Sequence, residues 1–284
     1  MGFEINSYLK RIGIQSVSTD IEGLSRMQAA QMQSIAFENI EVLLGRLPAL
    51  DSASIWQKLV GERRGGYCLE LNALYSEALT ALGFRVRPLL GRVRMGAETG
   101  GPRTHLALIV RLDGVEWLTD CGFGGPGPLT PLRLDITEPQ ICKAGSYRLR
   151  HDQITGETVL QRRERDNWFP LYGFDRSWVS PADFEAANVI CTRSPSSPFH
   201  RNLMMSIATK TGRISLFNAR RTEIDGDRET VRQLASLDEL AWSLSEDFGL
   251  DVDRLRIKLV WAHLENGQTA SPVQRRALLG NEPA

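Results

Sequence analysis

The chain has 284 residues, of which 42% are hydrophobic, and its 34 Lys and Arg residues balance 34 Asp and Glu residues. A chain of this length can bury most of the surface that its unfolded state exposes, in one large domain or in two to three smaller ones. Zero net charge removes the electrostatic footprint of a nucleic-acid binding protein, unless basic residues gather on one face, and the arginines are instead dispersed.

The first 83 residues predict helices. Apolar residues recur at helical spacing over residues 8–14, 21–35, 55–60 and 69–82. Gly83 follows the last of these segments as a C-cap. The N-terminus has no apolar signal core, and no apolar run approaches the 18 or so residues that span a bilayer. We therefore expect a cytoplasmic protein that has no membrane partner.

From residue 84 the hydrophobic pattern changes to the period of two that is typical of strands. Alternating or β-branched runs cover residues 86–93, 105–112, 115–120, 147–150 and 158–162. These runs predict an antiparallel sheet or barrel. A Pro- and Ser-rich stretch then precedes a last segment, in which strands are predicted at 203–209 and 214–217 and helices at 237–248 and 254–264.

The cysteines and histidines do not have the spacing of a metal site or of a disulfide framework. Neither a Cys-x-x-Cys pair nor a His-x-x-x-His or His-x-His pair occurs among four cysteines and four histidines. We therefore expect no structural disulfide and no metal.

Cys68 is the first candidate for chemistry. It follows Gly65 and Gly66 in the run RGGYCLELN, residues 64–72, where an apolar-periodic helix begins. Free backbone N–H groups and the helix dipole at such a position favour a thiolate, which a nucleophilic cysteine needs. A small buried hydrophobic side chain is the alternative, and position alone does not decide between them.

A predicted hairpin brings a histidine and a carboxylate together. The Asp-Gly turn at 113–114 pairs Leu112 with Val115. In this register His105 and Asp120 are diagonal neighbours on one face of the sheet, about 7 to 8 Å apart at their Cα atoms. Asp120 can then fix one nitrogen of the imidazole and leave the other to deprotonate a thiol.

Two observations bear on that register. It places Arg111 opposite Glu116, which is a favourable cross-strand pair, whereas one bulged residue would move His105 and Asp120 to opposite faces. The structural alternatives are that His105 is a buried strand residue with its hydrogen bonds made, and that Asp120 is a strand-end carboxylate that caps the next turn. A cysteine at a helix start together with this pair favours catalysis.

The glycine-rich loop at 122–127 follows the predicted strand that ends at Asp120. It lacks the helix of a dinucleotide-binding motif and the lysine of a P-loop, so it does not predict a phosphate site. Two interpretations of the loop stay open: a ligand entrance in which Phe123 offers an aromatic face, and a plain connection between elements. Cys121 points to the other face and is expected to pack in the core.

Several segments together resemble the arylamine N-acetyltransferase family. The run 64–72 is similar to the family's nucleophile motif, which often has Phe where Leu69 stands, and Cys121 replaces another small residue. Further similar segments are AFEN at 36–39, Thr104-His105, DCGFG at 120–124, the Ser/Pro/Phe segment 194–199 and Gly212-Arg213.

The resemblance implies an α+β fold with a cysteine-protease-like core. A helical bundle would span residues 1–83, an antiparallel β-barrel residues 84–191, and an α/β lid residues 192–284. Cys68, His105 and Asp120 would form a catalytic triad.

The resemblance also implies the substrates. Acetyl-coenzyme A would be the donor, and arylamines, hydrazines or arylhydroxylamines would be the acceptors. The acceptor pocket would be lined by Phe37, Val93, Phe123 and Phe199. The coenzyme cleft would be lined by Thr104, Gly124 and Gly125.

We expect a ping-pong reaction in which Cys68 takes the acetyl group before the amine does. A cysteine hydrolase or transglutaminase-like enzyme would use the same three residues on an amide, and an amide synthase would join a tethered acyl chain to an aromatic amine. A small-molecule binding protein with an inert core cysteine is the non-enzyme alternative.

Overall fold

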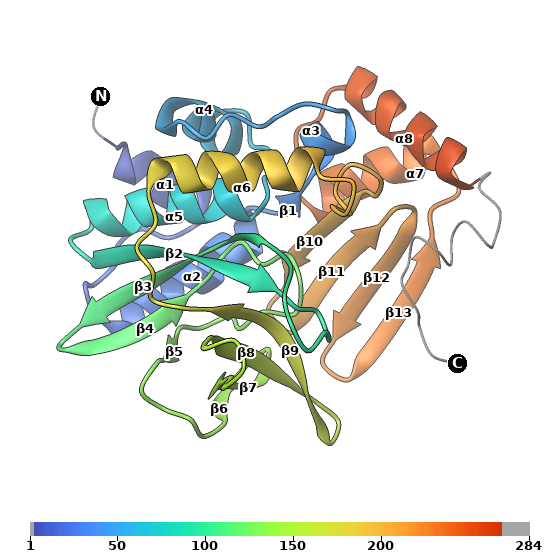
Figure 1. The fold of residues 1–284 in the computed structure, drawn as a ribbon. Coiled ribbons are helices and arrows are strands. Elements are labelled where there is room, and N and C mark those ends of the chain that lie inside the picture. Colours follow the sequence, from blue (N-terminus) through green and yellow to red (C-terminus); the bar gives the residue numbers. More distant parts are fainter. Residues whose placement is uncertain (1–2, 269–284) are drawn as a thin grey trace.

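The computed structural model describes residues 3–268, and most of its helices lie above the two sheets in the view of Figure 1. The predicted N-terminal helices are present, as α1 (Ile5–Arg11), α2 (Ile21–Ser34), α3 (Ile40–Leu43), α4 (Ser52–Trp56) with a π-helical turn Gln57–Gly61, and α5 (Cys68–Ala81). Helix α1 ends three residues earlier than the predicted segment 8–14. The reason is Gly13, whose φ of 75° lets the Ile14 N–H donate to the Leu9 carbonyl and close the helix.

An eight-stranded antiparallel sheet forms the centre of the molecule, in the order β5-β4-β3-β2-β9-β8-β7-β6. Its edge strands are joined by the side chain of Gln140, which accepts from the Arg133 N–H at 2.8 Å and donates to the Arg133 carbonyl at 2.9 Å. The sheet is thus a nearly closed barrel. Its strands are β2 (Arg85–Val93), β3 (Arg103–Leu112), β4 (Val115–Thr119), β5 (Leu132–Arg133), β6 (Gln140–Cys142), β7 (Gly145–His151), β8 (Thr158–Glu164) and β9 (Asn167–Phe174).

The predicted hairpin register is confirmed. Leu112 pairs with Val115 and Arg111 with Glu116, and the ladder continues without a bulge to its last pair, Leu108 with Thr119. Asp113 has a φ of 48°, as the first residue of a turn between twisted strands requires.

A second antiparallel sheet has five strands, in the order β1-β10-β11-β12-β13. They are β1 (Phe37–Glu38), β10 (Met204–Ala208), β11 (Gly212–Phe217), β12 (Arg220–Asp225) and β13 (Arg228–Gln233). The pattern of the sequence did not predict β12 or β13, because β13 is exposed along its whole length and has no apolar face to alternate with a polar one.

Helix α6 (Pro181–Arg193) is the main element that the hydrophobic period missed. It begins with Pro181 at the first turn, and the Asp183 carboxylate accepts from the Ser180 N–H at 2.7 Å. It lies beside α5 in Figure 1, and a hydrogen bond between Tyr67 and Asn188 joins it to the start of α5. The range 84–191 therefore contains most of a helix as well as the barrel.

The C-terminal part contains α7 (Leu237–Trp242), a π-helical turn Ser243–Asp247 and α8 (Arg254–Gln268), as predicted. Buried side chains form three clusters, one around α5, one between the second sheet and the C-terminal helices, and one inside the barrel. Of the predicted lid 192–284, residues 269–284 lie outside the described part. Within residues 3–268, no helix is long and apolar enough to cross a bilayer. The α+β fold class is confirmed.

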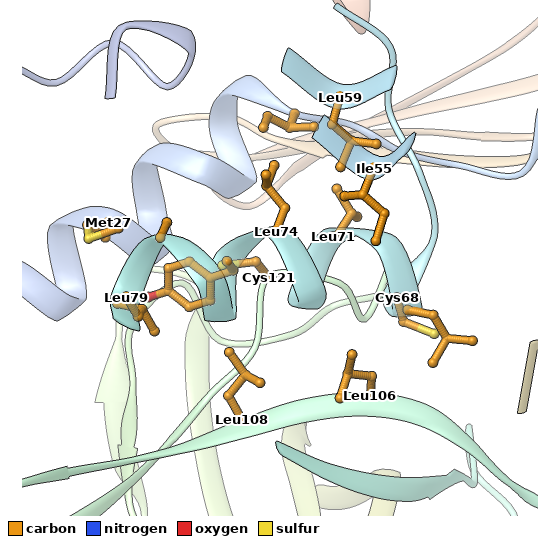
Figure 2. Close-up of a cluster of buried hydrophobic side chains, with 14 of the residues drawn as sticks. Met27, Ile55, Leu59, Cys68, Leu71, Leu74, Leu79, Leu106, Leu108 and Cys121 are labelled. Atoms are coloured by element: carbon orange, nitrogen blue, oxygen red, sulfur yellow. The ribbon is translucent and has the colours of Figure 1, made fainter. Parts of the chain in front are cut away.

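The cluster around α5 positions the candidate nucleophile. Figure 2 shows Leu71 and Leu74 of α5 packed toward Ile55 and Leu59, while Leu106 lies below Cys68. Burial of these side chains contributes several kcal/mol and holds α5 against α4 and the π-helical turn, while Leu106 and Leu108 of β3 pack on the opposite side of α5. The first turn of α5 is thereby fixed next to the strand that carries His105.

Candidate active site

Cys68 is the first residue of α5, and its approach is set by two glycines. A Cβ on Gly65 would lie 2.3 Å from the Ala36 carbonyl oxygen, and a Cβ on Gly66 would lie 2.8 Å from the Glu70 carboxylate. Glu70 accepts from the Tyr67 N–H at 3.1 Å, as in a capping box. The run RGGYC thus places the cysteine at a capped helix start. The packing leaves no room for a side chain at Gly65 or Gly66.

Two buried ion pairs hold the residues on either side of this turn in place. Lys58 contacts Glu70 at 2.7 Å, and Arg64 contacts Glu38 at 2.6 Å. Burial raises the pKa of Glu70, and the Lys58 ammonium opposes that rise. Because breaking one partner of such a pair leaves an uncompensated charge, these pairs fix the loop before Cys68.

His105 and Asp120 meet as the hairpin register predicted. The Nε2 atom of His105 lies 2.7 Å from Oδ2 of Asp120, and both side chains are buried. The Oδ1 atom of Asp120 accepts from Asn72 Nδ2 and from the Gly122 N–H, each at 2.8 Å. The carboxylate is therefore held by three donors, and Nδ1 of His105 is left facing the other way.

The imidazole of His105 also interacts with the Cys68 thiol, and this interaction shifts the pKa of both groups. Burial lowers the pKa of His105, but the charge and hydrogen bond of Asp120 and the contact with Cys68 outweigh it and raise the pKa to about 10. For Asp120, burial raises the pKa, and the His105 charge with the hydrogen bonds to Oδ1 brings it below its usual value. The imidazolium–carboxylate pair is thus the stable form at neutral pH.

Burial has the opposite consequence for the nucleophile. It raises the pKa of the Cys68 thiol above its usual value, and the hydrogen bond and the charge of His105 offset only part of that rise. The protonated imidazole is therefore the group that makes a thiolate accessible in this buried position. The three groups form one line of contacts from sulfur to carboxylate.

Asn72 is a site residue that the sequence did not single out. Besides its bond to Asp120, its Nδ2 donates to the Leu106 carbonyl at 2.6 Å, and its Oδ1 accepts from the Cys121 N–H at 2.9 Å. It lies one helical turn after Cys68, on the same face of α5. That spacing of four residues was the one available signal.

Aromatic rings enclose the imidazole. The Phe123 ring lies edge-on to His105, with centroids 5.2 Å apart, and the fully buried Tyr172 ring lies 4.6 Å away. The ring centroids of Phe37 and Phe199 lie 6.1 Å apart. Tyr172 was not predicted, because β9 was not recognised as a strand.

Val93, the fourth residue expected at the acceptor pocket, lies at the last position of β2, where it pairs with Tyr172. Its side chain is 39% exposed. It therefore stands near the aromatic residues at their solvent side.

The glycine loop lines a cavity of about 300 Å³. Gly124 has a φ of 71°, and a Cβ there would lie 2.7 Å from the Phe37 ring. Gly125 lies against the Phe123 ring, so the loop lets two aromatic side chains close in. The cavity is lined by Phe37, Gly124, Gly125, Tyr147, Arg162 and Arg213 among others, and Cys68 is not in this lining.

Thr104, which was expected at the coenzyme cleft, contributes its backbone. Its carbonyl oxygen accepts from the Cys68 thiol at 3.5 Å and from the Cys191 thiol at 3.9 Å. Over residues 3–268, no three His, Cys, Asp or Glu side chains come together as a metal site.

Comparison with known proteins gives a consistent answer. Residues 20–257 match a family model described as N-acetyltransferase. The chain is 36% identical to an arylamine N-acetyltransferase of Escherichia coli over 253 residues, which are 88% of this chain and 89% of the relative.

Solved structures agree with the sequence comparison. The structure of arylamine N-acetyltransferase from Salmonella typhimurium is similar with a TM-score of 0.87 at 32% identity, covering 92% of this chain and 99% of that one. The structure of the Mycobacterium marinum arylamine N-acetyltransferase in complex with CoA is similar with a TM-score of 0.85 at 30% identity, covering 93% and 99%.

Proposed function

Because this chain belongs to the arylamine N-acetyltransferase family, we propose that it moves an acetyl group from acetyl-coenzyme A to an arylamine, arylhydrazine or arylhydroxylamine through a thioester on Cys68. The observation that carries the proposal is the continuous line of contacts from Cys68 through His105 to Asp120. The reaction is ping-pong, since one sulfur atom is loaded by the donor and unloaded by the acceptor.

In the first half-reaction the Cys68 thiolate attacks the acetyl carbonyl of the donor. His105, held as imidazolium by Asp120, is the counter-ion of the thiolate, and it gives its proton to the sulfur of coenzyme A as that sulfur leaves. One thioester replaces another, so the step is nearly balanced in free energy. The protein supplies ionisation and alignment.

The start of α5 stabilises the tetrahedral intermediate. The amide N–H of Cys68 belongs to the first turn, whose N–H groups have no partner within the helix, and the helix dipole points its positive end there. An oxyanion formed at the attacked carbonyl develops its charge beside this amide.

In the second half-reaction the acceptor nitrogen attacks the acetyl group on Cys68. An arylamine is weakly basic and is neutral at pH 7, so it attacks without prior deprotonation. His105 takes the proton from the nitrogen as the Cys68 thiolate leaves, which restores the starting state. The ring wall of Phe123, Phe37 and Phe199, with Val93 at its rim, excludes water from the thioester and offers apolar faces to the acceptor.

The cavity beside the glycine loop suits the phosphates of coenzyme A. Its wall carries Lys143, Arg162 and Arg213 with one carboxylate, Asp227. The Nε atoms of Arg162 and Arg213 are buried without a hydrogen-bond partner. Burial lowers the pKa of Arg213, and the positive charge of Arg162 lowers it further. Two arginines that repel each other in one pocket are stabilised by an anion.

The rest of the donor lies between this cavity and the nucleophile. Gly124 and Gly125 let the pantetheine arm approach the loop backbone, and Thr104 lies where the arm reaches Cys68. The reaction needs no metal. We propose that it takes place in the cytoplasm.

Steady-state turnover tests the proposal. With acetyl-coenzyme A and an arylamine we expect parallel double-reciprocal lines, coenzyme A release in step with amide formation, and no turnover in Cys68→Ser or Cys68→Ala. Cleavage of a peptide amide without any use of acetyl-coenzyme A would support the cysteine hydrolase instead. Transfer only from a tethered long-chain acyl thioester would support the amide synthase.

A further inference from the structure

A second thiol lies beside the proposed nucleophile. Cys191 is in the last turns of α6, is only 4% exposed, and belongs to the same buried cluster as Cys68. The two thiols share one acceptor, the Thr104 carbonyl oxygen, at 3.9 Å from the Cys191 sulfur and 3.5 Å from the Cys68 sulfur. The two sulfur atoms therefore cannot be farther apart than the sum of these two short distances.

We propose that Cys191 is a resolving cysteine, which forms a reversible disulfide with Cys68 when a hydroperoxide oxidises the Cys68 sulfur. The proposal rests on the proposed function only in that both need a reactive Cys68. It adds a redox modification site to α6, outside the line of contacts that performs acetyl transfer.

The other two cysteines are not placed for this role. The Cys121 thiol contacts the Gln28 carbonyl at 3.8 Å on the far side of the strand end, and Cys142 lies in strand β6 of the barrel. Of the four cysteines, only Cys191 shares a hydrogen-bond acceptor with Cys68. The fold thus pairs two cysteines that are distant in sequence.

The two thiols differ in reactivity, as an oxidation of this kind requires. Burial raises the pKa of both thiols, but only Cys68 has a protonated imidazole that opposes the rise; the pKa of Cys191 stands at about 12, with only the Thr104 carbonyl opposing. The Cys68 thiolate is therefore the site that the hydroperoxide attacks, and Cys191 remains a neutral thiol until it reacts with the oxidised sulfur.

The chemistry is balanced in two steps. The Cys68 thiolate attacks one oxygen of hydrogen peroxide, a sulfur–oxygen bond forms as the O–O bond breaks, and the products are a sulfenic acid on Cys68 and one hydroxide ion. The Cys191 sulfur then attacks the Cys68 sulfur, and the sulfenic hydroxyl leaves as water with the proton of the Cys191 thiol. Cys68 and Cys191 together lose two electrons, and the peroxide gains them.

The second step needs the two sulfur atoms to approach to about 2 Å, from the short separation that their shared acceptor allows. Because a thiol is a weak donor, the bonds to Thr104 that must be given up are weak. The Pro- and Ser-rich segment 194–198 follows directly after α6, so the end of this helix is attached to irregular chain. The disulfide blocks Cys68 and protects it from irreversible oxidation to the sulfinic acid.

The test treats the full chain with a small molar excess of hydrogen peroxide and measures intact mass, free thiols and recovery of transfer activity by dithiothreitol. For the wild type we expect the loss of two hydrogen atoms, a fall from four free thiols to two, and a Cys68–Cys191 peptide in a non-reducing digest. Recovery should be nearly complete.

Cys191→Ser and Cys191→Ala should gain oxygen atoms instead and recover less than about one tenth of their own starting activity, because a sulfinic acid is not reduced by thiols. Cys142→Ser is the matched control and should behave as the wild type. A wild type that gains oxygen and forms no Cys68–Cys191 peptide would overturn the proposal, and this result needs no variant to fold.

A parallel sample that is first loaded from acetyl-coenzyme A separates this inference from the proposed function. If the acetyl-enzyme forms and resists peroxide, while the unloaded enzyme forms the disulfide, both are supported. Disulfide formation without any acetyl-enzyme would refute only the thioester mechanism. Acetyl-enzyme formation without a disulfide would refute only the role of Cys191.

Discussion

Replacing Asp120 with asparagine tests the electrostatic design of the site. In the folded chain Asp120 accepts from Asn72 and Gly122 through Oδ1 and contacts His105 through Oδ2. Because both donors to Oδ1 stay in place, the oxygen of the new amide takes that side, and its NH2 group points at His105. The amide then donates to Nε2, which moves the imidazole proton to Nδ1, the atom that faces Cys68.

The expected size follows from the pKa of His105. It stands at about 10 instead of 6.5, which corresponds to about 5 kcal/mol in favour of the imidazolium. Without the carboxylate this stabilisation is lost, and burial alone lowers the pKa. If all of this stabilisation is lost from the thiolate–imidazolium pair, the rate at pH 7 falls by about three to four powers of ten.

The assay is alkylation of Cys68 by iodoacetamide as a function of pH, together with single-turnover loading from acetyl-coenzyme A. We expect both rates to fall by this amount in Asp120→Asn while the far-UV spectrum is unchanged. Asp175→Asn is the matched control, since Asp175 pairs with Arg103 at the beginning of β3. Rates in Asp120→Asn within about tenfold of the wild type would refute the reasoning, since a tenfold effect is only about 1.4 kcal/mol.

Three further changes have defined outcomes. Asn72→Ala leaves a buried carbonyl and a buried amide unpaired and should lower the free energy of unfolding in urea by about 2–4 kcal/mol; a loss below about 0.5 kcal/mol would contradict this. The raised pKa of His105 stabilises the fold fully below pH 6.5, and this stability is lost as the pH rises through about 10. Urea unfolding at pH 7 and pH 10 should therefore show a larger loss in the wild type than in Asp120→Asn, and equal losses would contradict it. Arg213→Met should raise the KM for acetyl-coenzyme A about tenfold or more with little change in kcat, since it removes a charged donor to the proposed phosphate site; an unchanged KM would place the phosphates elsewhere.

Local rules explain what the sequence could predict of the site. An Asp-Gly turn fixes a hairpin register, so the contact between His105 and Asp120 followed from counting, and two glycines before an apolar period placed Cys68 at a helix start. The change of hydrophobic period at residue 84 and the Pro- and Ser-rich stretch gave the order of the helical, sheet and last mixed segments, and the family resemblance agreed with it. These signals depend on residues that are close in sequence.

Long-range packing explains what was missed. Tyr172 lies on β9, whose Pro170 and nearby register shift obscure the strand pattern. Asn72 was visible only as a polar residue on a helix, because its three partners come from three other positions in the fold. Cys191 comes from the unpredicted α6, so its approach to Cys68 could not be read from spacing.

The central claim is that Cys68 itself carries the acetyl group between donor and acceptor. The enzyme is incubated with acetyl-coenzyme A alone, freed from coenzyme A, weighed by intact-mass spectrometry, and then mixed with an arylamine. The account predicts one added acetyl group, mapped to the Cys68 peptide, absent in Cys68→Ser and Cys68→Ala, and transferred to the amine in a single turnover. An unchanged mass, in a sample that still acetylates the amine when both substrates are present, would contradict it.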